Sequence, residues 1–363
     1  TTFIRQIAEG FDNSNCRHGG DSRCLGLTPY HINSFMRMKQ PWTGTFTSLV
    51  KFKGTNGQNP YGNLILLDDG NLYGTTYGGG TEGWGTFFKL TLSGTLTRLF
   101  SFPNGTGRLQ AGVTRLGSDF WGVTSKLGGS VFRITPSGEY THLSYLEGTS
   151  GVEPIGALTL GNDGNFYGTT VIGGDTSTFG NGCGTIFKIT PQGLPTTIYE
   201  FHCNEGANPY GALTLGTDGN FYGTTENGGS NGGGTIFKVT PSGVLTTLVN
   251  FNGTNGSKPL GALLQASDGN FYGTTYDGGK ISNKCNVYTC GTIFKVTPSG
   301  ALTTLVNFKS TNGSSPYAGL TLGNDGSFYG TTYYGGGKGY GTVFKMTLPS
   351  GPLKSVTRRV KHR

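Results

Sequence analysis

The chain has 363 residues, 67 of them glycine, and carries a formal net charge of +8. Because 34% of its residues are hydrophobic and many of these are aromatic, the composition excludes a disordered glycine-rich linker. Five of the positive charges lie between Lys354 and Arg363, and residues 41–350 carry 17 basic and 16 acidic residues, so the body lacks the basic stripe typical of nucleic-acid-binding proteins.

The first 52 residues carry only a faint pattern. Residues 45–52 predict a strand, and residues 35–39 loosely match the third strand of the repeats that follow. From residue 53 onward the motif Tyr-Gly-Thr-Thr recurs at intervals of 46 to 57 residues, which is typical of a radial or stacked array of β-sheets. The copies occupy residues 73–76, 121–124 (as Trp-Gly-Val-Thr), 167–170, 222–225, 272–275 and 329–332.

Each period contains four strand signals separated by turn residues. In the fourth copy, runs rich in β-branched and aromatic residues alternate with Asp218-Gly219 and with Pro241-Ser242-Gly243, which supply the backbone angles of tight turns. These runs are residues 211–215, 221–225, 234–240 and 245–251. No window shows a helical period, so each repeat predicts a four-stranded antiparallel sheet and the chain predicts an all-β propeller.

Counting these sheets predicts the number of blades. Residues 53–352 hold six tandem repeats, and residues 353–357 read as a last outer strand within the basic tail, residues 353–363. We expect seven blades, with residues 1–52 as a degenerate first blade, because this segment is about one period long. The alternative is six blades, in which residues 45–52 close the last sheet and the preceding residues are an N-terminal extension.

The cysteines favour an oxidising compartment. The six fall into three local pairs, Cys16 with Cys24, Cys183 with Cys203, and Cys285 with Cys290. Cys183 and Cys203 are equidistant from Gly193 in a predicted hairpin, so they face each other and can form a disulfide. No apolar run approaches the 18 residues of a membrane span, and we expect a secreted or extracellular protein without metal or cofactor. A metal site at Cys16, His18 and Cys24 is the weaker alternative.

The repeat itself resembles a known one. The unit Asp-Gly-Asn-Phe-Tyr-Gly-Thr-Thr, followed by Gly-Thr-Ile-Phe-Lys-Val-Thr-Pro-Ser-Gly, resembles the tandem repeat of the GloVer-type (choice-of-anchor) family of secreted bacterial β-propellers over residues 42–350. The resemblance implies a propeller and a secreted location, and no established activity. The strand order is more distantly similar to that of NHL and streptogramin-lyase propellers, which implies that the Leu-Thr-Leu strand lines the central channel. No histidine of this chain matches the position of the histidine on which such lyases rely.

Repetition separates structural residues from functional ones. A residue present in every blade is expected to serve the blade, whereas a binding site occurs once. By this criterion the motif tyrosines, the aspartates that precede a turn glycine and the basic residues of the third strands are structural, and the aspartates are not calcium ligands. The aspartates are Asp69, Asp163, Asp218, Asp268 and Asp325, and the basic residues are Lys89, Arg133, Lys188, Lys238, Lys295 and Lys345.

The unrepeated loops hold the candidate ligand-binding residues. Because the strands are antiparallel, the two tight turns of each blade lie on one face, and the variable loops after each Thr-Thr pair lie on the other. Aromatic side chains among Asp, Asn and Gly suit sugar rings, which stack on aromatic faces while their hydroxyls form hydrogen bonds. The candidates are Tyr77, Trp84, Asp175, Glu226, Tyr276, Asp277, Tyr288, Tyr333, Tyr334 and Tyr340.

Three functions fit these residues. The first is a secreted binding module for surface or matrix glycans, with a polysaccharide or a cell-surface protein as partner and no nucleic acid. The second is a structural or protein-interaction scaffold, and the third is a glycan-cleaving hydrolase or lyase that uses Asp175, Glu226 and Asp277. Because no histidine has a motif neighbour and no nucleophile elbow or phosphate loop is present, a binding protein is favoured over an enzyme. The oligomeric state is not set by the sequence.

Overall fold

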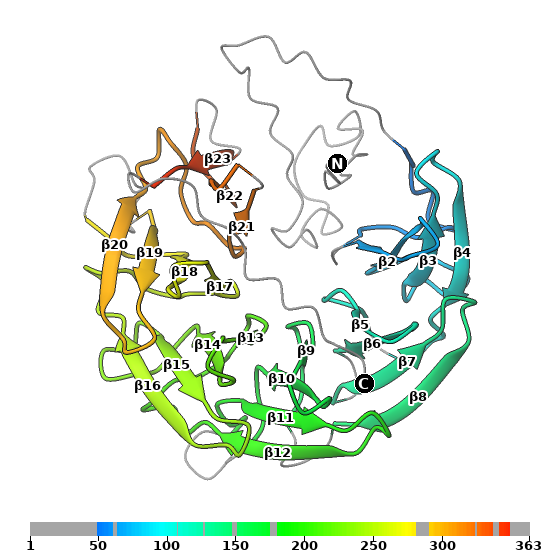
Figure 1. Ribbon diagram of the computed structural model, residues 1–363, viewed down its shortest axis with the longest axis horizontal. Coiled ribbons are helices and arrows are strands. Elements are labelled where there is room, and N and C mark those ends of the chain that lie inside the picture. The colour runs from blue at the N-terminus through cyan, green and yellow to red at the C-terminus, as the bar shows by residue number, and fades with distance from the viewer. Residues whose placement is uncertain are drawn as a thin grey trace.

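The computed structural model describes residues 49–348 except 61–63, 107, 126–127, 147–150, 175–179, 281–289, 324 and 337–340. The described residues form six antiparallel sheets that stand like blades around a centre (Figure 1), which confirms the predicted β-propeller. The first strand of each blade lies near the centre, and in blades 1 to 5 the fourth strand lies outermost, while blade 6 has three described strands. The first strands therefore line the channel, as the distant propeller resemblance implied.

The strands follow the chain in regular order within each blade. Blade 1 comprises β1 (Ile65–Leu66), β2 (Leu72–Thr76), β3 (Thr86–Leu90) and β4 (Leu96–Ser101), and blade 2 comprises β5 (Thr114–Leu116), β6 (Asp119–Thr124), β7 (Ser130–Ile134) and β8 (Tyr140–Tyr145). Blade 3 comprises β9 (Thr159–Leu160), β10 (Phe166–Thr170), β11 (Thr185–Ile189) and β12 (Pro195–Glu200), and blade 4 comprises β13 (Thr214–Leu215), β14 (Phe221–Thr225), β15 (Thr235–Val239) and β16 (Leu245–Asn250). Blade 5 comprises β17 (Leu264–Gln265), β18 (Phe271–Thr275), β19 (Thr292–Val296) and β20 (Leu302–Asn307), and blade 6 comprises β21 (Thr321–Leu322), β22 (Phe328–Thr332) and β23 (Thr342–Met346).

The repeated aspartate holds the first tight turn of the blade. In blade 4, the Asn220 backbone N–H donates to Asp218 Oδ1 at 3.1 Å, and the Tyr222 hydroxyl donates to Asp218 Oδ2 at 2.8 Å. Burial alone raises the pKa of Asp218, but the hydrogen bonds from Asn220 and Tyr222 outweigh it and the pKa is lowered. The same tyrosine-to-aspartate bond recurs in blades 1, 3, 5 and 6. These aspartates are thus turn residues.

The core lies between neighbouring blades, where aromatic rings pack. The Tyr222 ring of blade 4 lies 4.0 Å from the Phe271 ring of blade 5, and Phe251 at the end of the outer strand lies 5.5 Å from Phe294. The glycine of each Tyr-Gly-Thr-Thr motif makes room for a phenylalanine of the third strand, because a Cβ on Gly223 would lie 2.4 Å from Phe237 Cζ. The motif therefore encodes the packing of the blade.

The number of described blades is six, the alternative count rather than the preferred seven. Most of the expected first blade, residues 1–48, lies outside the described residues, as does the expected outer strand 353–357. Of the strand expected at residues 45–52, only residues 49–52 are described; they are assigned no strand and pack against blade 1. Among the described residues no helix long and apolar enough to cross a membrane occurs.

The predicted disulfide of blade 3 is present. Cys183 and Cys203 are bonded, with their Cα atoms 5.5 Å apart, where the loop before β11 meets the end of the outer strand. Cys290, which precedes β19, is also disulfide-bonded. Cys16, Cys24 and Cys285 lie outside the described residues.

Candidate functional site

The face opposite the aspartate turns is built from two segments of each blade. The segment that leads into the first strand pairs with the loop that follows the second strand, as in blade 4, where Ala207 and Asn227 exchange both backbone hydrogen bonds at 2.8 and 3.0 Å. Equivalent bridges join Ser257 to Asp277 in blade 5 and Ser314 to Tyr334 in blade 6. We call the surface formed by these paired segments the loop face.

The Thr-Thr pair of the motif fixes the loop face. The Thr225 hydroxyl donates to the Asn227 carbonyl at 2.9 Å and accepts the Thr235 backbone N–H at 3.0 Å, so it ties the loop to the third strand. The Thr224 hydroxyl donates to the Gly261 carbonyl of the next blade at 3.2 Å. The two bonds of the second threonine recur in blades 1, 3, 5 and 6. The backbone of the loop face is therefore the same in these blades while its side chains differ.

A second backbone feature recurs on this face. In five of the six entry segments, all but that of blade 2, the residue before a proline has a positive φ, between 52° and 59°. Such a φ is rare for residues other than glycine and is disfavoured before proline. Its carbonyl accepts the N–H of the residue that follows the Thr-Thr pair, as Asn208 does from Glu226 at 3.0 Å. Such backbone strain is often found at ligand sites. These residues are Asn59, Glu153, Asn208, Lys258 and Ser315.

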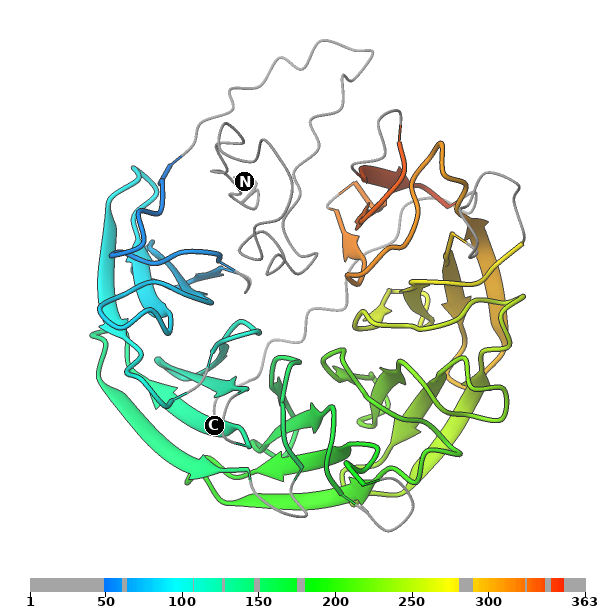
Figure 2. The ribbon, with the colours of Figure 1, turned by 180° about the vertical axis from the view of Figure 1, so that it is seen from behind.

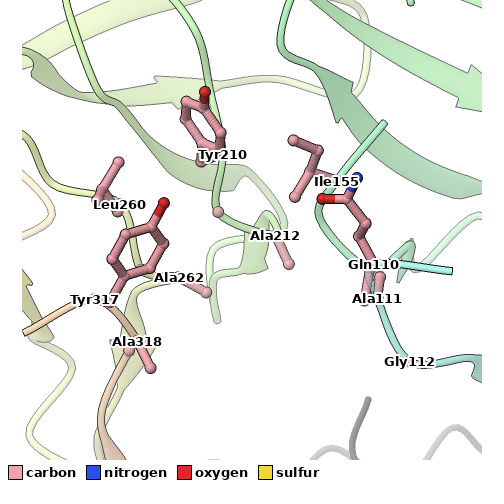
Figure 3. Close-up of a pocket in the computed structure, with 14 residues that line it drawn as sticks. Gln110, Ala111, Gly112, Ile155, Tyr210, Ala212, Leu260, Ala262, Tyr317 and Ala318 are labelled. Carbon is pink, nitrogen blue, oxygen red and sulfur yellow. The ribbon is translucent and has the colours of Figure 1, made fainter. Parts of the chain in front are cut away.

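A hollow opens where this face meets the central channel. Each of blades 2 to 6 contributes the residue that lies four positions before its first strand, and alanines and glycines form the floor (Figure 3). Tyr210, Leu260 and Tyr317 line one side, and Gln110 and Ile155 line the other. We call this hollow the channel mouth. Its lining is about equally polar and apolar, and the Tyr210 and Tyr317 hydroxyls and the Gln110 amide are its polar side-chain groups.

Carboxylates of blades 4 and 5 lie beside the channel mouth. Burial raises the pKa of Glu226, Lys258 opposes this, and the neighbouring charge of Asp277 raises it further. Burial also raises the pKa of Asp277, although Lys258 Nζ lies 3.9 Å from its Oδ2. The pKa of Tyr210 is raised to about 12, by burial and then by the charge of Glu226. Two half-buried carboxylates therefore share one lysine next to a tyrosine hydroxyl.

Aromatic residues continue the site onto blades 5 and 6. The Tyr276 ring lies edge-on to the Tyr317 ring, with centroids 5.8 Å apart, so the loop of blade 5 touches the channel mouth of blade 6. Tyr333 and Tyr334 form a second edge-on pair with ring centroids 4.2 Å apart, and Tyr334 is half exposed. These rings form an aromatic surface next to the carboxylates.

A separate group of aromatic residues lies on blade 1. The Arg108 guanidinium of the segment entering blade 2 lies 4.7 Å from the Tyr77 ring centroid and 5.4 Å from that of Trp84. Because Arg108 is exposed, the cation and the two rings form one amphipathic patch.

The candidate residues from the sequence occupy equivalent positions in different blades. Tyr77, Glu226, Tyr276 and Tyr333 each directly follow the Thr-Thr pair, and Asp277 and Tyr334 come one residue later. The structure brings Glu226, Tyr276 and Asp277 together with blade 6, whereas Tyr77 and Trp84 belong to the group on blade 1. Asp175, Tyr288 and Tyr340 lie outside the described residues.

Sequence reasoning missed four residues of the site, Arg108, Tyr210, Lys258 and Tyr317. They lie in the segments that lead into each blade, whereas the sequence analysis drew its candidates from the loops after the Thr-Thr pairs. A signal was present, because the residues on either side of the repeated proline vary while the proline and the glycine after it recur. Among the described residues, no group of three His, Cys, Asp or Glu side chains is placed to hold a metal ion.

The raised pKa of Glu226 predicts a pH-dependent cost in stability. The folded-state pKa of Glu226 lies above its unfolded value, so between these two pKa values the folded protein binds more protons than the unfolded one. The folded state therefore loses stability as the pH rises from the unfolded pKa through the folded pKa. Chemical denaturation at pH 7 should therefore give Glu226→Gln an unfolding free energy higher than that of the wild type by on the order of 1 kcal/mol. This difference should vanish near pH 4. Glu139→Gln, an exposed position on the opposite face, serves as the control. A destabilised Glu226→Gln variant at pH 7 would contradict the burial of this charge.

Comparison with known proteins extends the sequence resemblance. A family model described as the Gloeobacter/Verrucomicrobia repeat matches residues 33–182 and 175–359. No curated protein matches the chain. Similar solved structures include a protein of unknown function from Bacteroides thetaiotaomicron VPI-5482, at 12% identity and a TM-score of 0.47, with 80% of this chain and 70% of that chain covered. Another is a luciferin-regenerating enzyme, at 14% identity and a TM-score of 0.49, with 84% of this chain and 95% of that chain covered. At these values no activity is transferred from either structure.

Proposed function

The chain belongs to the Gloeobacter/Verrucomicrobia repeat family, and we propose that it is a secreted propeller that binds surface or matrix polysaccharides on its loop face. One observation carries the proposal. At positions where blades 1, 3, 4, 5 and 6 have the same backbone, the side chains differ from blade to blade, and on blades 4 to 6 they include tyrosines and carboxylates around the channel mouth. A scaffold that served only its own stability would have no need of this variation.

The chemistry of this surface matches that of sugars. The apolar face of a pyranose stacks on a tyrosine ring, and Tyr276, Tyr317, Tyr333 and Tyr334 offer such rings on two neighbouring blades. The carboxylate oxygens of Glu226 accept hydrogen bonds from sugar hydroxyls. Each contact contributes little, so a polymer that spans several blades gains affinity through multivalency. The disulfides at Cys183–Cys203 and at Cys290 support a secreted location.

A glycan-cleaving activity is the second candidate. The observation that favours it is the interaction of Glu226 with Asp277 on neighbouring blades, where both pKa values are raised. A carboxyl group whose pKa is raised by burial can act as a general acid beside a second carboxylate. Release of reducing ends from a bound polysaccharide, abolished in Glu226→Gln, would establish this activity over simple binding.

The binding proposal predicts the effect of removing the exposed tyrosine pair. Tyr333→Ala combined with Tyr334→Ala should weaken binding to an immobilised bacterial cell-surface polysaccharide by about 10-fold, since each stacked ring at this exposed position contributes roughly 0.7 kcal/mol. Thermal unfolding should change little, because Tyr334 is 51% exposed. The measurement is retention on a polysaccharide column or a glycan array.

Its control uses the opposite face. Leu194→Ala and Val244→Ala remove the large exposed side chains of the tight turns, 67% and 64% exposed, and should leave binding intact. Loss of binding in these two variants and not in the tyrosine variant would place the site on the turn face, the face that carries the Asp-Gly and Pro-Ser-Gly turns. Absence of glycan binding by the wild-type chain, with capture of a cell-surface protein instead, would favour the scaffold.

A further inference from the structure

Among the described residues, nothing covers one flank of blade 6, whereas the same flank of blades 1 to 5 is covered by the next blade. In blades 1 to 5 the second residue of the third strand is buried against the next blade, as Ile236 of blade 4 shares one buried cluster with Phe271 and Phe294 of blade 5. In blade 6 this residue is Val343, which is 45% exposed. The equivalent residues Phe87, Val131, Ile186, Ile236 and Ile293 are all 0 or 1% exposed. Val343 therefore lies where a following blade belongs.

The opposite end of the arc is the free flank of blade 1. Residues 49–52, which precede blade 1 in the chain, pack on this flank as the end of an outer strand does on the other blades. The Phe52 ring lies 5.4 Å from Phe88 at 64°, which reproduces the contact between Phe201, at the end of blade 3, and Phe237 of blade 4 (5.3 Å, 66°). Leu49 likewise occupies the position that Leu248 of the outer strand of blade 4 has against blade 5. A Cβ on Gly94 would lie 2.7 Å from the Leu49 carbonyl oxygen, as one on Gly300 would from that of Leu248.

The loop after Phe52 also follows the pattern that joins one blade to the next. The Lys53 N–H donates to Asn56 Oδ1 at 2.7 Å, as the Asn252 N–H does to Asn255 Oδ1 at 2.9 Å between blades 4 and 5. Residues 49–52 thus occupy the place of the outer strand of a blade that precedes blade 1.

Blade 6 does not itself stand next to blade 1. Neighbouring blades are joined by rings of their second strands, as Tyr272 is to Phe328 at 4.4 Å. On blade 1, Leu72 holds the position of Phe328, but its cluster contains Leu49 and Phe52 and no residue of blade 6. Figures 1 and 2 show the described blades as an open arc from blade 1 to blade 6.

We propose that residues 1–48 form a seventh blade between blades 6 and 1, with its outer strand ending at Phe52. The length fits, because 52 residues lie within the observed period of 46 to 57 residues. In the register of the third strands, residues 35–38 align with residues 236–239, so Met36 takes the place of Phe237 and packs against Val343 of blade 6. A propeller closed in this way leaves no exposed sheet flank.

Thiol labelling of the full chain tests this assignment. Val343→Cys should react with a maleimide about 100-fold more slowly than Val244→Cys, which is on an exposed turn, and as slowly as Val131→Cys, whose position is fully buried. All three are valine-to-cysteine changes, and the wild-type chain gives the background of its own cysteines. Reaction of Val343→Cys within a few fold of Val244→Cys would overturn the proposal.

A second variant identifies what covers the flank. Adding Met36→Asp to Val343→Cys should speed labelling at least 10-fold while Val131→Cys carrying the same change stays protected. The monomeric fraction is used, as established by light scattering. Protection that appears only in a dimer would assign the flank to a second copy, and protection unaffected by Met36→Asp would assign it to another segment; either result would overturn the proposal. Neither measurement involves a glycan, so the outcome is independent of the proposed function.

Discussion

Tyr276→Ala combined with Tyr317→Ala should weaken polysaccharide binding by about 30-fold, the largest effect expected from two substitutions on the loop face. The two rings come from different blades and meet edge-on, with centroids 5.8 Å apart, so Tyr276 extends the aromatic surface of Tyr317 at the channel mouth. Loss of roughly 1 kcal/mol for each ring gives about 2 kcal/mol in total. Isothermal titration with a soluble fragment of the polysaccharide measures the change.

The matched control is another exposed tyrosine. Tyr145 lies in the outer strand of blade 2, away from the channel mouth, and is 54% exposed. Tyr145→Ala should bind as the wild type does. Unchanged affinity in the Tyr276→Ala, Tyr317→Ala variant would remove these rings from the site, and a fall in melting temperature by many degrees would mark them as core residues.

Gly223→Ala should destabilise the fold by about 3 kcal/mol, in the upper range for overpacking a core. The added Cβ would lie 2.4 Å from Phe237 Cζ and 3.0 Å from Leu213 Cδ2, and both side chains are buried between blades with no room to yield. Chemical denaturation of the two proteins gives the difference in unfolding free energy.

Gly180→Ala provides the comparison for this change. A Cβ at Gly180 would meet nothing within 4 Å, so this substitution should be close to neutral. Equal stabilities for the two alanine variants would show that the motif glycine does not accommodate the phenylalanine of the third strand.

The fold was predictable because each local signal is repeated and consistent with the others. The motif at residues 222–225 lies within β14, the Asp218-Gly219 pair forms a tight turn, and the tyrosine of the motif explains why that aspartate recurs. The disulfide followed from the same reasoning, since Cys183 and Cys203 flank a hairpin of known centre.

The site was only partly predictable, because it is assembled across blades. Tyr210 and Tyr317 are separated by two blades in the sequence and meet only when the entry segments converge on the channel mouth. The sharing of Lys258 between Glu226 and Asp277 likewise depends on the radial arrangement. Sequence periodicity defines each blade but gives neither the spacing of loops around the ring nor the number of blades that close it.

The central claim is that the loop face around the channel mouth binds polysaccharide, and a crystal structure of the full chain with a bound oligosaccharide tests it most directly. We predict that a sugar ring stacks on Tyr276 or Tyr317, with hydroxyls in hydrogen-bond contact with Glu226 or Asp277. An oligosaccharide bound on the turn face beside Asp218 and Ser242, or along the outer strands, would contradict the account.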